Sequence, residues 1–156
     1  MDEISSERVK LHDLPEIQQK QIAEALKEKS PIKIPDNVTP KIDQKAAGYD
    51  QIAYKWNDGT YTYEVRWHTS TSNAPDTPPN WRVDRTTPGF AGGKDPITGD
   101  KIQGYPSQKE TLIFPPDAPS YLVPNKVWQD AVDEYNKNTA TPEQLELLKW
   151  GHFISD

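Results

Sequence analysis

Alternating apolar and polar residues predict a β-sheet in the middle of the chain. An Asp58-Gly59 pair lies between two such segments, and this dipeptide is a strong signal for a hairpin turn. The segments with a strand pattern are 52–56, 60–68, 81–86, 111–114 and 121–123. Because the first two are joined by a tight turn, we expect an antiparallel sheet of about four to five strands.

A helical pattern precedes the sheet. Asp13 can cap a helix and Pro15 suits its first turn, so we predict a helix over about 14–29. The first 45 residues contain no Phe, Trp or Tyr. We therefore expect residues 1–45 to add little to the core and to form a helical and extended connector. The compact domain is then expected over residues 46–156.

Two further helical patterns follow the sheet. Asn125 can cap a helix over 126–138, and Thr141 with Gln144 has the spacing of a capping box. The last helix is expected to stop at Gly151. The predicted fold class is thus α+β, with an N-terminal helix, a central antiparallel sheet and two C-terminal helices.

Composition narrows the classes of function. Cys is absent, which excludes disulfides, thiolate metal sites and Cys nucleophiles. The 18 basic and 24 acidic residues give a net charge of −6, which argues against a broadly basic nucleic-acid-binding surface but allows a local basic patch. No apolar run approaches the ~18 residues of a membrane span, so no membrane partner is expected. The 15 prolines predict many loops, including a glycine-rich one over residues 88–104.

The segment 60–68 carries the most informative side chains. Alternation places Glu64, Arg66 and His68 on one face, each about 6.5–7 Å from the next by strand rise. Arg82 and Thr86 join this face if the next strand pairs with it. Such a patch suits metal-free cleavage of RNA, in which a base takes the 2′-hydroxyl proton, an acid protonates the leaving oxygen and arginine stabilises the phosphoryl charge.

Roles within this patch stay open. Glu64 is a candidate base and His68 a candidate acid, or the reverse. Arg66 with either Arg82 or Arg85 would hold the phosphoryl oxygens. In a regular strand Arg85 faces inward, so a bulge or the strand end would be needed to free it. Further candidate substrate contacts are Thr69, Thr71, Tyr61 and His152.

The same residues also fit an ordinary solvent-exposed sheet face, since one face of an antiparallel sheet is commonly in contact with water.

Other catalytic chemistries have less support in the sequence. The three His residues lack zinc-ligand spacing, and Gly92-Gly93-Lys94 lacks the full phosphate-loop pattern. We therefore predict no metal site and no cofactor.

Five stretches of the chain carry a resemblance to known proteins: 54–69, 81–89, 128–131, 139–144 and 151–153. Their most specific elements are Arg66-x-His68-Thr69 and Trp81-x-Val83-x-Arg85-Thr86-x-x-Gly89. These stretches resemble the C-terminal toxin domains of bacterial polymorphic toxins. Such domains follow type VII (LXG), contact-dependent or Rhs-type delivery regions.

This resemblance implies a ribonuclease of the barnase/EndoU/colicin/RelE superfamily, whose sheet face carries the catalytic side chains. It implies a secreted toxin that cuts RNA in the cytoplasm of a neighbouring bacterial cell and is neutralised by a cognate immunity protein. The chain would be a monomer or a toxin–immunity heterodimer. Residues 1–45 would then connect to a delivery region.

Three alternatives remain. An ADP-ribosyltransferase toxin also uses an Arg, a Ser or Thr and a Glu, which Arg66, Thr86 and Glu64 could supply. A deoxyribonuclease toxin usually needs a metal, for which no ligand cluster is evident. A non-enzymatic module could use the polar face to bind a partner.

Overall fold

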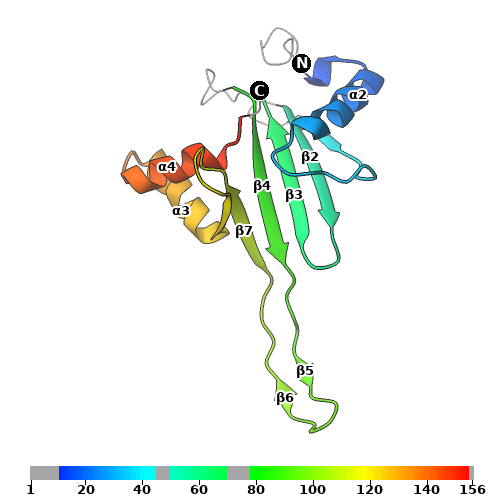
Figure 1. Cartoon of the computed structure of the whole chain (residues 1–156), viewed down its shortest axis with the longest axis vertical. Helices are drawn as coiled ribbons and strands as arrows, with labels where there is room; N and C mark the ends of the chain where they lie inside the picture. The colour runs from blue at the N-terminus through cyan, green and yellow to red at the C-terminus, as the bar shows by residue number, and fades with distance from the viewer. Residues whose placement is uncertain (1–10, 45–49, 70–77, 155–156) are drawn as a thin grey trace.

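A computed structural model describes residues 11–44, 50–69 and 78–154. It has the predicted α+β architecture, and its main sheet has six antiparallel strands in the order β1-β2-β3-β4-β7-β8 (Figure 1). These strands are β1 (Lys41–Gln44), β2 (Asp50–Asn57), β3 (Thr62–His68), β4 (Asn80–Thr87), β7 (Gln108–Ile113) and β8 (Tyr121–Pro124). The strand that the sequence does not predict is β1, because its four residues include a single apolar one, Ile42.

Helices lie on both faces of the sheet. The helix α2 (Glu16–Leu26) lies between the 3-10 turns η1 (Leu11–Asp13) and η2 (Lys27–Lys29). On the other side, α3 (Asn125–Asn136) and α4 (Pro142–Gly151) pack together beside β7 (Figure 1). The capping box predicted for α4 is confirmed, since Thr141 Oγ1 accepts a 3.1 Å hydrogen bond from Gln144 N.

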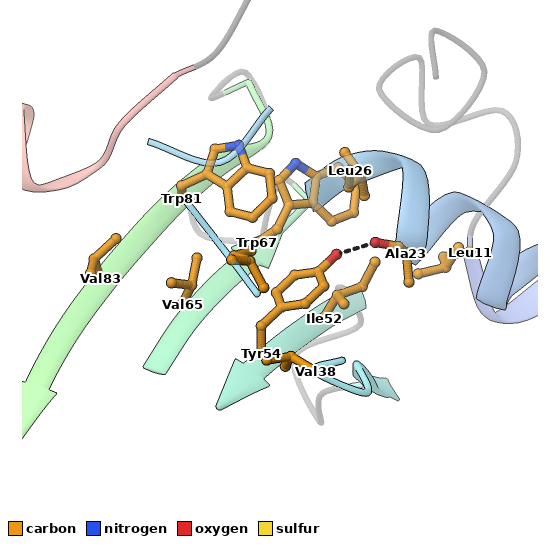
Figure 2. Close-up of a cluster of buried hydrophobic side chains, with 11 residues drawn as sticks. Leu11, Ala23, Leu26, Val38, Ile52, Tyr54, Val65, Trp67, Trp81 and Val83 are labelled. Atoms are coloured by element: carbon orange, nitrogen blue, oxygen red, sulfur yellow. Dashed lines mark hydrogen bonds between the residues drawn. The ribbon is translucent and has the colours of Figure 1, made fainter. Parts of the chain in front are cut away.

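The main core lies between α2 and one face of β2, β3 and β4. Trp67 and Trp81 are cross-strand neighbours on this face, and both are buried. The Tyr54 hydroxyl donates a 2.6 Å hydrogen bond to the Ala23 carbonyl of α2, so the helix is held to the sheet by a buried polar contact as well as by apolar packing (Figure 2). The buried set is Leu11, Ala23, Leu26, Ile34, Val38, Ile52, Tyr54, Val65, Trp67, Trp81 and Val83.

The expectation that residues 1–45 add little to the core is wrong for the residues described. Five aliphatic side chains from this segment belong to the buried set, and aliphatic residues fill a core without any aromatic ring. Polar contacts fix the segment further. The Leu11 amide donates to the Asp50 carboxylate at 2.7 Å, and Lys27 Nζ donates to the Val38 carbonyl at 2.7 Å. The segment is therefore integral to the fold.

The glycine-rich stretch forms a two-stranded arm as well as turns. Phe90 and Tyr105 exchange two backbone hydrogen bonds of 2.8 Å. Beyond them β5 (Gly93–Lys94) pairs with β6 (Lys101–Ile102), and the arm projects from the end of β4 and β7 (Figure 1). Gly99 has φ +77° in the turn at the tip, a backbone conformation that glycine adopts without strain.

Candidate active site

The polar face of β3 and β4 forms as predicted. In the register of these strands, Arg66 lies opposite Arg82 and His68 lies opposite Asn80. Thr86 lies at the other end of the same face. The five predicted residues Glu64, Arg66, His68, Arg82 and Thr86 therefore share one side of the sheet.

A buried carboxylate, that of Asp84, lies at the centre of this face. It is 1% exposed, accepts a 2.6 Å bond from Arg66 Nη2 and accepts a 2.9 Å bond from Thr111 Oγ1. Arg82 and Lys109 each place a nitrogen 3.7 Å from it. A buried charge is tolerated when it is paired and hydrogen-bonded, and these contacts meet that need for Asp84. The same contacts hold the guanidinium groups of Arg66 and Arg82 in place. The sequence alone puts Asp84 on this face but gives it no role.

The C-terminal segment brings His152 to His68. Phe153 pairs with Trp81 of β4 through backbone hydrogen bonds of 2.7 and 2.9 Å. Because side chains alternate along an extended segment, this pairing turns Phe153 to the core face and His152 to the polar face. The two imidazole centroids are 6.4 Å apart with their planes at 84°.

A groove of about 610 Å³ lies between this polar face and the two C-terminal helices. The Arg82 guanidinium carbon lies 4.6 Å from the ring centre of Trp128, and the Trp128 and His152 rings are 5.2 Å apart. The cation and the imidazole are therefore both supported by one buried indole. The other lining residues are His68, Thr69, Asn80, Val132, Tyr135, Asn136, Leu145, Leu148, Lys149 and Ile154.

Both imidazoles carry their proton on Nδ1. His152 Nδ1 lies 2.7 Å from the Leu148 carbonyl, and His68 Nδ1 lies 3.2 Å from the Thr69 carbonyl. A carbonyl oxygen can only accept, so each Nδ1 donates and each Nε2 carries the lone pair. Burial, aided by the charge of Arg82, lowers the pKa of His152 to about 4 and brings the pKa of His68 below its ordinary 6.5. Both rings are therefore neutral at pH 7.

The structure brings His152, and not Glu64, to His68. Glu64 and His68 are four residues apart on β3, a separation of about 13 Å by strand rise. The Glu64 carboxylate instead lies 3.6 Å from Arg66 Nε. The titratable side chain that the structure places beside the His68 ring is therefore His152.

Arg85 and Tyr61 lie on the opposite face of the sheet. Arg85 faces Tyr63 across a regular register and donates a 2.9 Å bond to Glu110. Its guanidinium carbon lies 4.0 Å from the centre of the Tyr61 ring. No bulge interrupts this described part of β4, so Arg82 rather than Arg85 lines the groove.

The threonines are scattered. Thr69 lines the groove, and its hydroxyl accepts a 3.0 Å bond from the Asp50 amide. Thr86 lies at the far end of β4, about six residues from the His68 level. Thr71 falls outside the described residues.

Across residues 11–44, 50–69 and 78–154, no three His, Asp or Glu side chains gather as a set that could hold a metal ion. In the same part of the chain, no helix has the length and apolar character needed to cross a membrane. No protein-family model, curated protein or solved structure matches the sequence.

Proposed function

We propose that this protein is a metal-independent ribonuclease with its active site at the sheet end of the groove. One observation carries the proposal: two imidazoles 6.4 Å apart share the groove with the guanidinium of Arg82. A base and an acid that flank one phosphodiester, with a cation for its oxygens, are the parts that metal-free RNA cleavage needs. The sequences of β3 and β4 resemble bacterial toxin domains, and this resemblance, which implies a ribonuclease, supports the proposal.

The roles of the two histidines follow in this proposal from their shared position in the groove and from the stronger lowering of the His152 pKa by burial. His152 has the more strongly lowered pKa, about 4, so it remains deprotonated and serves as the base. Its Nε2 takes the proton of the RNA 2′-hydroxyl, and the 2′-oxygen then forms a bond to phosphorus. The bond from phosphorus to the 5′-oxygen breaks, and the 5′-oxygen takes a proton from Nε2 of His68 in its doubly protonated form, which is populated at acidic pH. The products are a 2′,3′-cyclic phosphate and a 5′-hydroxyl.

The groove carries positive charge although the whole protein has a net negative charge. Arg82 and Lys149 line the groove, and Arg66 lies on the same sheet face. Arg82 is beside both imidazoles, so its guanidinium is suited to the charge that develops on the phosphoryl oxygens. The net charge of −6 is therefore compatible with an RNA-cutting centre.

The biological setting that we propose is an antibacterial toxin domain. It would be secreted, would act on RNA in the cytoplasm of a neighbouring bacterial cell, and would be blocked by a cognate immunity protein. Support comes from the resemblance described above, whose Arg66-x-His68-Thr69 element runs along the polar face to the groove.

The test uses the purified full chain and an end-labelled RNA, with and without EDTA. We expect cleavage in both conditions, with cyclic phosphate and 5′-hydroxyl ends. His68→Gln and His152→Gln should each lower kcat about 10²–10⁴-fold. Tyr121→Phe, on the edge strand β8, is the control that should cleave normally. Cleavage that EDTA abolishes would contradict the metal-free mechanism.

Induced expression in bacteria separates the alternatives. RNA loss and growth arrest that both disappear with His68→Gln are expected. Growth arrest with intact RNA would overturn the ribonuclease proposal and favour an ADP-ribosyltransferase, while plasmid loss would favour a deoxyribonuclease. Normal growth, together with inactivity of the purified chain, would favour a binding module.

A further inference from the structure

We infer that the helical end of the groove binds the base of an unstacked nucleotide, so that single-stranded RNA is the substrate class. This inference rests on the proposed function, because it places the base next to the phosphate held by His68 and His152. It adds a second part to the site, built by α3 and α4 instead of the sheet.

The two ends of the groove are separated by the length of a nucleotide. Trp128 and His152 are in contact, so the start of α3 lies beside the end of α4, and the two helices run antiparallel. Tyr135 is seven residues beyond Trp128, which is about 10 Å along the helix axis. Leu145 precedes His152 by the same number of residues. The far end is therefore formed by Tyr135 and Leu145, about 10 Å from the imidazoles.

The chemistry of the far end suits a nucleobase. Tyr135 is 57% exposed and Leu145 is 47% exposed, although both line the groove. An accessible tyrosine ring is a stacking surface for any base. Asn136 lies beside Tyr135, and its side-chain amide can both donate to and accept from a base edge.

A buried polar atom at the sheet end also points to a ligand. Asn80 is 2% exposed, and its Nδ2 donates to the Pro78 carbonyl at 3.2 Å. Its Oδ1 has no hydrogen-bond partner among the residues that the structure describes. An unsatisfied buried acceptor is costly, and a ribose hydroxyl in the groove would satisfy it.

A nucleotide matches both the apolar and the polar lining of the groove, whereas a purely apolar occupant matches only the apolar part. An acyl chain or an apolar peptide side chain could cover Leu145 and Leu148, but it would leave Asn80 Oδ1 without a donor. A nucleotide offers a base, a hydroxyl and a phosphate in that order. Because a paired base must first be unstacked and unpaired, entry of the base costs least when the RNA is single-stranded.

Binding and cleavage together test the inference. Uridine 3′-monophosphate, adenosine 3′-monophosphate and inorganic phosphate are titrated into the full chain by calorimetry. Tyr135→Ala should raise the Kd of at least one mononucleotide by about 5- to 150-fold and leave phosphate binding unchanged. Tyr121→Ala, which removes a 48% exposed tyrosine on β8, is the matched control. A labelled RNA should be cut as a single strand and resist cleavage when annealed to its complement.

The outcomes separate this inference from the proposed function. Mononucleotide binding that depends on Tyr135 in a chain that cuts no RNA would overturn the ribonuclease and support the base site. RNA cleavage with equal rates on single and double strands, and with no effect of Tyr135→Ala, would overturn the base site and leave the ribonuclease intact. Absence of mononucleotide binding to the wild-type chain would also overturn the base site. Thermal melting of each variant checks that Tyr135→Ala is folded.

Discussion

The charge balance of the polar face depends on Asp84. This carboxylate is 1% exposed and meets Arg66, Arg82 and Lys109 together with the Thr111 hydroxyl. Removing its charge leaves several cations close together at a partly buried surface. The negative charge of Asp84 therefore balances the positive charges of the basic side chains around it on this face.

We expect Asp84→Asn to lower the free energy of unfolding by about 3–5 kcal/mol, because it breaks a buried ion pair. The control is Asp130→Asn in the exposed pair with Lys126, where the cost should be at most about 1 kcal/mol. Urea denaturation followed by circular dichroism measures both. Equal stabilities of the two variants would show that Asp84 does not organise this face.

The pKa values of the two histidines predict an acidic optimum for RNA cleavage. Activity should fall at low pH as His152 takes up a proton near its pKa of about 4. It should fall again at higher pH as His68 loses its proton, at a pKa below the ordinary 6.5. The pH profile of kcat/KM should therefore be a bell with its maximum between about 4 and 6.5. A maximum above pH 8 would contradict the assignment of acid and base.

At the level of elements, the groove depends on how closely the end of α4 approaches α3. Gly151 is the buried last residue of α4, and a β-carbon at this position would overlap the six-membered ring of Trp128. The same indole contacts Arg82 and His152. Glycine is thus required by packing against the residue that supports the site.

Gly151→Ala should force Trp128 to move, lowering the free energy of unfolding by about 1–3 kcal/mol and reducing RNA cleavage. Gly93→Ala is the matched control, because its β-carbon would meet only Phe90 Cζ, at an ordinary 3.6 Å. Chemical denaturation and tryptophan fluorescence report the two effects. Unchanged stability and fluorescence in Gly151→Ala would mean that the helices can separate without cost.

For the whole molecule, the N-terminal segment is part of the fold because it covers the apolar face of the sheet. Leu11 and Ala23 are fully buried, and Leu26 is 3% exposed (Figure 2). On α2, which carries Ala23 and Leu26, the side chain of Ile17 is 67% exposed. The helix therefore has one buried face that the sheet requires and one that faces solvent.

A chain that begins at residue 46 should show no cooperative thermal unfolding, because β2, β3 and β4 lose the layer that buries them. Within the full chain, Leu26→Ala should cost about 2–5 kcal/mol. Ile17→Ala on the same helix should change stability by less than about 0.5 kcal/mol. Calorimetry measures all three, and a cooperative transition in the shortened chain would contradict this view of the segment.

Local sequence signals are sufficient for much of the architecture. Alternation and the Asp58-Gly59 turn predict the β2–β3 hairpin, and Thr141 with Gln144 predicts the start of α4. The polar face with Arg66 and His68 also follows from alternation, since side-chain direction along a strand has a period of two. These features depend on neighbours in sequence, so a single sequence contains the information that predicts them.

Other features depend on residues that are distant in sequence. The strand-like pairing of Phe153 with Trp81 brings His152 to His68, and no local pattern reports a bridge between residues 72 positions apart. Likewise, the buried contact between Ala23 and Tyr54 makes the aromatic-free segment part of the core. The sequence by itself determined the helices, every strand of the main sheet except β1, and which residues of β3 and β4 share a face. The tertiary structure decided which faces meet, because burial and long-range pairing act only after the chain has folded.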